Sequence, residues 1–151
     1  MNTTVFLKVM DSRFKITRRT IAAVPSDRLD FRPMPDMITA RELALHLLGN
    51  YTFLDAGLAD GSWDPKTFHV AGDYPTTEAI VAKFDALYGT ARAKLPAVPD
   101  EVFERRVSPF GTEQKVSSLV QGIAEHEIQH RGQLQVYLRL MGVKPPSAYG
   151  E

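Results

Sequence analysis

The chain has 151 residues, of which 44% are hydrophobic and 24% charged, a balance typical of one soluble globular domain spanning residues 1–151. Its 18 basic residues are matched by 18 acidic ones, so the net charge gives no reason to expect nucleic acid or anionic lipid as a partner. The absence of cysteine excludes disulfide bonds, a thiolate nucleophile from the protein and cysteine-bound zinc. Any metal must therefore be bound by histidine or carboxylate.

Neither a membrane span nor a targeting segment is predicted. No apolar run approaches the roughly 18 residues that a membrane-spanning helix needs. The first residues lack a basic segment followed by an apolar one, the pattern of a secretory signal, so a cytoplasmic location is the default expectation.

Two helices are predicted in the first part of the chain. Apolar residues at helical spacing indicate a helix from about Val5 to Val24, which ends before a proline. The next helix is predicted to begin at Thr39, because Thr39 and Glu42 match the capping box in which each side chain bonds an unpaired backbone N–H. That helix is expected to end near Ala59.

Two further helices are predicted after residue 75. The third is expected to begin at Thr76 or Thr77 and to end before Pro96. The fourth is expected over residues 117–141, with Gly142 directly after it as the residue that ends a helix in the left-handed conformation.

The connections between these helices are long. Residues 61–75 are expected to form an ordered loop that holds Trp63 and Phe68, with His69 beside them in a structural or solvent-facing role. Residues 97–116 are expected to be irregular, with Val102, Phe103 and Val107 either in a short strand or in a docked loop. The sequence thus predicts an all-α fold, a four-helix bundle with long ordered connections.

Three of the four histidines lie on the apolar faces of predicted helices. At 100° per residue, His126 and His130 lie within about 60° of one another on the face that also carries Gln133. His46 shares the inward face of the second helix with Asn50. A single inward histidine is usually a core residue with one hydrogen bond, but imidazoles one turn apart can bind one ion, and the pattern favours a three-histidine metal site. Asn50 and Gln133 are candidates for orienting a ligand or a bound water, the alternative being packed polar residues.

Residues 126–130 also match H-E-x-x-H, the signature of zinc proteases in which the glutamate activates a water and a third ligand follows downstream. No histidine follows His130, and the one acidic residue after it is Glu151. Glu127 lies about 100° around the helix from His126, so it is expected to reach the margin of the site or to face water. Proteolysis is the less favoured interpretation.

Two glycines interrupt the fourth predicted helix. Gly122 and Gly132 each lower helix propensity by about 1 kcal/mol relative to alanine. We therefore expect a neighbouring backbone to approach closely at both positions.

Several stretches resemble the DinB/YfiT-like superfamily of bacterial four-helix bundles with a three-histidine metal site. These are LALHLLGNYTFLDAGL around the second helix, HEIQHRGQLQVYLRLMGVKPP at the C-terminal end and, more loosely, VPSDRLDFRPMPDMITARELALH. The resemblance implies that His46, His126 and His130 are the metal ligands. It also implies homodimers and activities such as transfer of low-molecular-weight thiols, thiol-dependent isomerisation or metal-dependent hydrolysis.

Three imidazole ligands leave at least one position open on Zn²⁺, and more on an octahedral ion such as Ni²⁺ or Fe²⁺. We expect a divalent ion, with zinc or nickel preferred and iron or manganese as alternatives. The pocket above the ion is expected to be lined by the first helix and the 61–75 loop, where Trp63 and Phe68 form an apolar wall.

The preferred functional hypothesis is a metal-dependent transferase or hydrolase that acts on a small molecule, with no catalytic side chain assigned. In the transferase version the sulfur must arrive on a low-molecular-weight thiol, because the protein has no cysteine. The alternative is a stress-response bundle that binds a metal or ligand without turnover. A third hypothesis makes the histidine cluster an assembly device between two copies of the chain.

Overall fold

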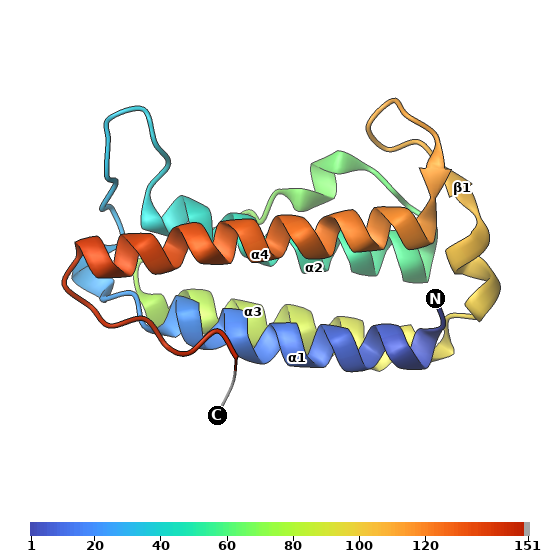
Figure 1. Cartoon of the computed structure of the whole chain (residues 1–151), viewed down its shortest axis with the longest axis horizontal. Coiled ribbons are helices and arrows are strands. Elements are labelled where there is room, and N and C mark those ends of the chain that lie inside the picture. Colours follow the sequence, from blue (N-terminus) through green and yellow to red (C-terminus); the bar gives the residue numbers. More distant parts are fainter. Residues whose placement is uncertain (150–151) are drawn as a thin grey trace.

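Four helices packed side by side dominate residues 1–149, the part of the chain that the computed structural model describes (Figure 1). They are α1 (Thr3–Ala22), α2 (Ala40–Asp60), α3 (Thr77–Lys94) and α4 (Val116–Leu140). The predicted all-α bundle is confirmed, and the predicted helix boundaries are correct to within about two residues. No helix in the described range combines the length and apolarity that crossing a lipid bilayer requires.

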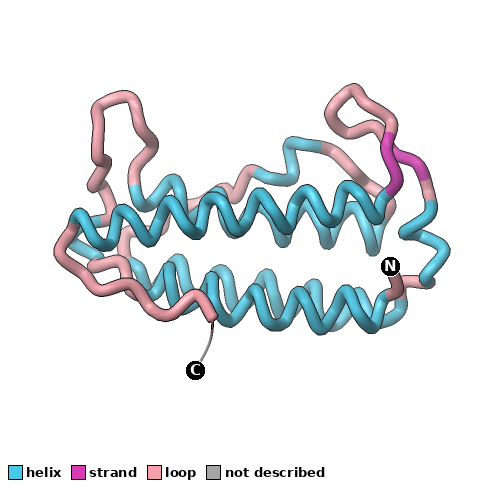
Figure 2. Tube along the Cα trace, in the orientation of Figure 1, coloured by secondary structure: helices cyan, strands magenta, loops and turns pink. Residues whose placement is uncertain are grey.

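The order of the helices explains why one connection is long. The colours of Figure 1 show that α2 and α3 run in the same direction, so residues 61–76 return along the bundle before α3 begins. This return passes over α2 and contains the short helix η2 (Pro65–Phe68). Helix α4 runs antiparallel to α2, and the two lie against each other along the bundle (Figure 2).

The stretch between α3 and α4 is more ordered than predicted. It contains η3 (Leu95–Ala97), η4 (Asp100–Glu104) and a small antiparallel ladder of β1 (Arg106–Val107) with β2 (Gln114–Lys115). A short strand was one of two predictions for Val102, Phe103 and Val107. Val107 does pair with Gln114, but Val102 and Phe103 lie in η4. The turn of this hairpin rises above α4 at one end of the bundle (Figure 1).

The centre of the bundle is aromatic. Phe14 from α1 stacks on Tyr88 from α3, with ring centroids 3.6 Å apart. Tyr51 from α2 meets Phe84 from α3 edge to face at 4.8 Å. Such offset and edge-on pairs are favourable beyond the burial of their area, and they tie α1, α2 and α3 together.

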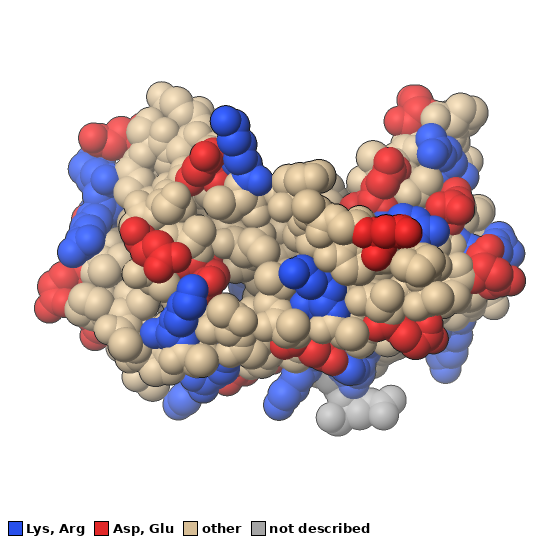
Figure 3. Space-filling model, turned by 180° about the vertical axis from the view of Figure 1, so that it is seen from behind, with Lys and Arg blue, Asp and Glu red and all other residues tan. Residues whose placement is uncertain are grey.

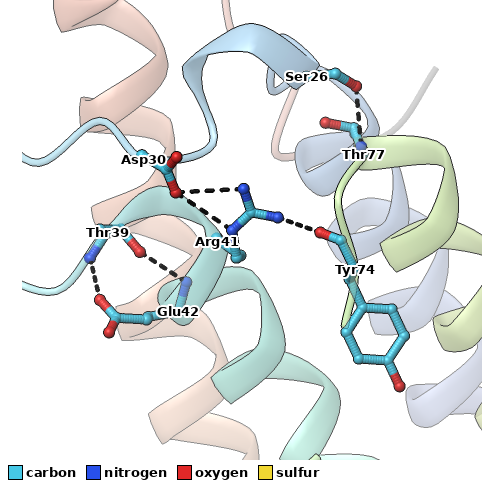
Figure 4. Close-up of polar contacts among 7 residues, drawn as sticks. All are labelled: Ser26, Asp30, Thr39, Arg41, Glu42, Tyr74 and Thr77. Carbon is cyan, nitrogen blue, oxygen red and sulfur yellow. Dashed lines mark hydrogen bonds and ion pairs between the residues drawn. The ribbon is translucent and has the colours of Figure 1, made fainter. Parts of the chain in front are cut away.

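Polar contacts fix the position at which α2 begins. The predicted capping box is present, because Thr39 Oγ1 accepts from the Glu42 N–H at 3.1 Å and the Glu42 carboxylate accepts from the Thr39 N–H at 2.6 Å. Arg41 bonds to Asp30 and donates to the carbonyl of Tyr74, which joins this turn to the residues before α3 (Figure 4). The first turn of α2 is therefore held by contacts to the loop before it and to the residues before α3. These contacts also position the residues one to two turns further along α2.

The helix ends follow the predicted chemistry. Thr76 caps α3 by accepting from the Ala79 N–H, and Ser26 accepts from the Thr77 N–H at 2.9 Å (Figure 4). Gly142 follows α4 with φ of +81°, and the next N–H, that of Val143, returns to the Leu138 carbonyl at 2.8 Å. This is the glycine-dependent termination expected from the sequence.

The expectation of close backbone approach at Gly122 and Gly132 is wrong. A Cβ added at either position would meet no atom within 4 Å. The close approaches occur instead at Gly49, where a Cβ would collide with the backbone carbonyl of Phe68, and at Gly57, where it would collide with the Trp63 ring. The glycines of α2 thus allow the returning 61–76 segment to lie directly on that helix.

We predict opposite effects of alanine at two helical glycines. Gly49→Ala should lower the free energy of unfolding by about 1–3 kcal/mol, because the methyl group collides with a backbone atom. Gly132→Ala should raise it by about 0.5–1 kcal/mol, because an exposed helix gains propensity at no steric cost. Urea denaturation followed by circular dichroism would measure both, and equal shifts would contradict the assignment of the close contact.

Candidate metal centre

Three histidine side chains from two helices converge at the interface of α2 and α4. Nε2 of His46 lies 3.0 Å from Nε2 of His126. Together with His130, they offer one nitrogen atom each within a group whose members all lie within 4.8 Å of one another. The structure therefore brings together the three residues that the sequence singled out as candidate metal ligands.

Helix geometry explains the convergence. A separation of four residues places His126 and His130 one turn apart on one side of α4, and their ring centroids are 4.4 Å apart. Because α4 packs against α2, this side faces His46, whose ring lies 4.8 Å from His126 and 4.7 Å from His130. All three rings are partly buried.

Asn50 orients the ring of His126. The amide oxygen Oδ1 of Asn50 lies 3.0 Å from Nδ1 of His126, and an amide oxygen can only accept, so the proton is on Nδ1. This leaves the Nε2 lone pair of His126 directed toward the cluster. Asn50 is itself almost fully buried, and its Nδ2 has no hydrogen-bond partner among residues 1–149, which is a cost of holding the amide in this position.

A chain of three hydrogen bonds orients the ring of His130. Its Nδ1–H donates to Oε1 of Gln133 at 3.0 Å, and the Gln133 Nε2–H donates to the Tyr137 hydroxyl at 3.4 Å. Tyr137 is fully buried and donates in turn to the carbonyl of Ile38 at 3.0 Å. Asn50 and Gln133, predicted as orienting residues, therefore each contact the outer nitrogen of a different ring, as the supporting residues of metal sites do.

The environment of the cluster favours neutral imidazoles. Burial, together with smaller contributions from the nearby rings of His130 and His46, lowers the pKa of His126 to about 4. Burial, with a smaller contribution from His130, also lowers the pKa of His46. These two rings are therefore neutral at pH 7, which is the protonation state that a metal ion requires of its histidine ligands.

The donor set fits a divalent metal ion. Two nitrogen ligands of one tetrahedral zinc ion lie about 3.3 Å apart, because each Zn–N bond is about 2.0–2.1 Å long. The observed 3.0 Å between the Nε2 atoms of His46 and His126 is close to this value. The same two nitrogens lie within hydrogen-bond distance of each other, with the donor set by the tautomer, and a bound cation would take the place of that contact. Histidine-only coordination suits zinc, nickel or iron.

A cavity of about 500 Å³ opens beside the cluster. His46 and His126 line it, together with Phe68 from η2 and Phe110 and Gln114 from the hairpin. The sequence analysis missed Phe110 and Gln114, because nothing in a local pattern shows that residues 107–114 fold over the start of α4. The hairpin is thus part of the candidate site.

The predicted lining of this cavity is correct only for Phe68. Trp63 packs against Gly57 and the ring of Phe53, 5.3 Å away, and it does not line the cavity. The expectation that the first helix lines it is also wrong, since α1 packs on α3 and on the other flank of α4. The fourth histidine, His69, is exposed and lies outside the cluster.

Glu127 neither borders the cavity nor faces water, contrary to both expectations for it. Its side chain is buried, with 5% exposed, and its carboxylate accepts from Thr17 Oγ1 at 2.6 Å and from the Tyr51 hydroxyl at 3.1 Å. Arg131, one turn further along α4, is also buried and lies 3.4 Å from the same threonine oxygen. The 100° step from His126 turns this carboxylate toward α1, where it connects three helices.

This position removes the basis of the protease interpretation, in which the glutamate must lie beside a metal-bound water. Glu151, the one acidic residue after His130, lies outside the described residues. Burial raises the pKa of Glu127, against the effect of its hydrogen bonds from Thr17 and Tyr51 and the nearby charge of Arg131. Burial also raises the pKa of Tyr51 and lowers that of Arg131. The buried group of Glu127, Thr17, Tyr51 and Arg131 is a desolvated structural element of the core.

Comparison with known proteins identifies relatives over the whole chain. The sequence model of the DinB family matches residues 1–151. In Bacillus subtilis strain 168, YjoA is 27% identical over 134 residues, which covers 87% of this chain and 85% of YjoA. YrdA of the same organism is 23% identical over 149 residues, or 96% of this chain and 86% of YrdA.

Two solved structures share the fold. The DinB-like protein YjoA from Bacillus subtilis superposes with a TM-score of 0.78 at 22% identity, covering 97% of both chains. A DinB-like protein from Bacillus cereus ATCC 10987 gives a TM-score of 0.79 at 17% identity, covering 95% of both chains. At these identities the likeness shows the arrangement of the helices and nothing of the chemistry.

We predict that Glu127→Ala lowers the free energy of unfolding by about 3 kcal/mol, because it leaves two buried hydroxyl groups without their acceptor and removes the negative charge near buried Arg131. Glu125→Ala is the matched control. Glu125 is exposed on the same helix, and its loss should change stability by at most about 0.5 kcal/mol. Urea denaturation compares the two variants, and equal destabilisation would contradict a structural role specific to Glu127.

Proposed function

The chain belongs to the DinB family, and on that basis we propose that it is a metal-dependent enzyme that joins a low-molecular-weight thiol to a small electrophile. The observation that carries the proposal is the convergence of three imidazole nitrogens beside an open cavity. We propose His46, His126 and His130 as the ligands of one divalent ion, with zinc or nickel preferred. A site with three protein ligands leaves a position for substrate, as catalytic metal sites do and structural ones do not.

When bound, the ion would supply Lewis acidity that lowers the pKa of a coordinated thiol or water into the neutral range. The protein's own residues would hold the ion and orient its histidine ligands. Asn50 and Gln133 keep the outer nitrogens of His126 and His130 protonated, so that the inner nitrogens are free to bind. The apolar side chains of the cavity offer few hydrogen-bond partners to water beside the reacting groups, which favours an added thiol over hydrolysis.

The position of Glu127 supports thiol transfer over hydrolysis. Hydrolysis by a metal-activated water is commonly assisted by a carboxylate that takes the water's proton. In the described part of the chain no carboxylate lines the cavity, and Glu127 is bonded to Thr17 and Tyr51. A thiol ionises far more readily than water and has less need of such a base.

The proposed reaction balances without a redox partner. The thiol sulfur forms a bond to an electrophilic carbon, the bond from that carbon to its leaving group breaks, and the thiol proton is released to solvent. Because the chain has no cysteine, the sulfur comes from the cosubstrate, and no covalent intermediate forms on a protein thiol.

We predict that the purified protein binds about one Zn²⁺ or Ni²⁺ per chain and that His126→Ala weakens this affinity by at least about 100-fold. His69→Ala, which removes the exposed histidine, is the matched control and should bind as the unaltered protein does. Metal analysis and isothermal titration calorimetry measure stoichiometry and affinity. At a free metal concentration of 100 times Kd, the metal should also stabilise the fold by about 2.7 kcal/mol. Unchanged binding in His126→Ala would refute the proposed ligand set.

We also predict turnover by the metal-loaded protein. Loss of free thiol, followed colorimetrically with a panel of bacterial thiols and electrophiles, should exceed the uncatalysed rate and should disappear in His126→Ala. The His69→Ala variant should keep the full rate. Stoichiometric metal binding without any thiol consumption would instead favour the non-catalytic binding protein.

A further inference from the structure

The cavity beside the histidine cluster has an almost wholly apolar lining, which metal binding alone does not require. Apart from His46 and His126, its walls consist of four apolar side chains, one glutamine and one glycine. These are Phe68, Phe110, Gln114, Leu119, Gly122 and Ile123. A volume of about 500 Å³ is within the range of sites that hold small organic molecules.

The cavity offers no countercharge to a ligand. Within residues 1–149, no lysine, arginine, aspartate or glutamate lines it, whereas the surface seen in Figure 3 carries acidic and basic side chains side by side. Away from the position of the proposed ion, a charged group that entered this lining would lose hydration without gaining an ion pair or several hydrogen bonds. The part of the ligand that fills the cavity is therefore uncharged.

The walls suit an aromatic group in particular. Phe68 is stacked on Phe53, with centroids 4.3 Å apart and planes at 17°, so its ring is held in one orientation. The ring of Phe110 lies 6.3 Å from that of Phe68. The ring of His126 also lies 6.2 Å from the ring of Phe68, in an edge-to-face arrangement. A planar ring placed among them gains offset or edge contacts of the kind that aromatic pairs prefer.

Gly122 lies where a side chain would enter this space. A glycine in the interior of a helix is unfavourable, yet a Cβ at position 122 would meet no atom within 4 Å. Packing therefore does not require the glycine. Since Gly122 lines the cavity, any larger residue there would occupy the space beside His126 that a ligand could fill.

We infer that this cavity receives an uncharged aromatic group of the small-molecule substrate and that Gly122 and Phe110 determine this specificity. The inference rests on the proposed function, because it places the group beside the same histidine cluster. The aromatic group is the part of the electrophile or of the thiol that extends from the reacting atom toward the hairpin.

Binding of size-matched probes to the metal-free protein tests the inference without any contribution from a metal or from turnover. The probes are 2-methoxynaphthalene, which is uncharged, 2-naphthoate, which is an anion, and 2-naphthylmethylammonium, which is a cation. Probe fluorescence gives each Kd. The uncharged probe should bind at least about tenfold more tightly than either charged one. Equal or tighter binding of a charged probe would overturn the inference.

Two variants locate the binding. Gly122→Leu should weaken binding of 2-methoxynaphthalene by about tenfold or more, because its side chain fills the cavity. Phe110→Ala, at an exposed position of the hairpin, should weaken it by about threefold to tenfold. Gly132→Leu is the matched control, since it adds the same side chain to an exposed glycine of the same helix away from the cavity, and it should leave Kd unchanged. An unchanged Kd in Gly122→Leu would refute the site.

Metal titration of the same variants separates this inference from the proposed function. Gly122→Leu should bind Zn²⁺ with the stoichiometry of the unaltered protein, because position 122 contributes no ligand atom. Metal binding without selective probe binding defeats the inference alone. Selective probe binding without metal binding defeats the proposed metal-dependent activity and leaves the aromatic site in place.

Discussion

The rotation of α4 about its own axis is the constraint on which the candidate site depends. That helix carries His126 and His130 on one flank and Glu127 and Arg131 on the next. The carboxylate of Glu127 is bonded to hydroxyl groups of α1 and α2, and a buried carboxylate that lost these partners would be strongly destabilising. The hydrogen bonds therefore oppose any rotation of α4. With that flank held by α1, the two histidines are directed at α2 and its own histidine.

The contact between α2 and the 61–76 segment has a similar organising effect on the cavity. Gly49 has no side chain, so the backbone of Phe68 lies directly on the helix. This places the Phe68 ring on that of Phe53 and beside the histidine cluster. The hairpin between α3 and α4 then supplies Phe110. The lack of a side chain at Gly49 thus lets Phe68 approach α2 as one wall of the cavity. The lack of a side chain at Gly122 leaves space in the cavity beside α4.

The electrostatics of the two sides of α4 are divided accordingly. On the cluster side, burial and mutual proximity keep the imidazoles of His126 and His46 neutral, and Asn50 holds the proton of His126 on its outer nitrogen. On the core side, the buried carboxylate is satisfied by hydroxyl groups and lies close to a buried guanidinium. The five letters H-E-x-x-H therefore contain residues with two different surroundings, since His126 and His130 face the histidine of α2 while Glu127 faces the core. A step of one residue, which is about 100° around the helix, is enough to separate them.

The sequence by itself determined the helices, their capping residues and the inward direction of three histidines, because these follow from the period of a helix and from chemistry within a few residues. It also indicated Asn50 and Gln133, which share helical faces with the rings that they contact. Only the tertiary structure decided which residues line the cavity, since Phe110 and Gln114 reach it through a hairpin and Trp63 is diverted to Gly57. The surroundings of the Glu127 side chain were likewise decided only by the tertiary structure. A helical wheel gives an angle, but which neighbour occupies that angle depends on the packing of all four helices.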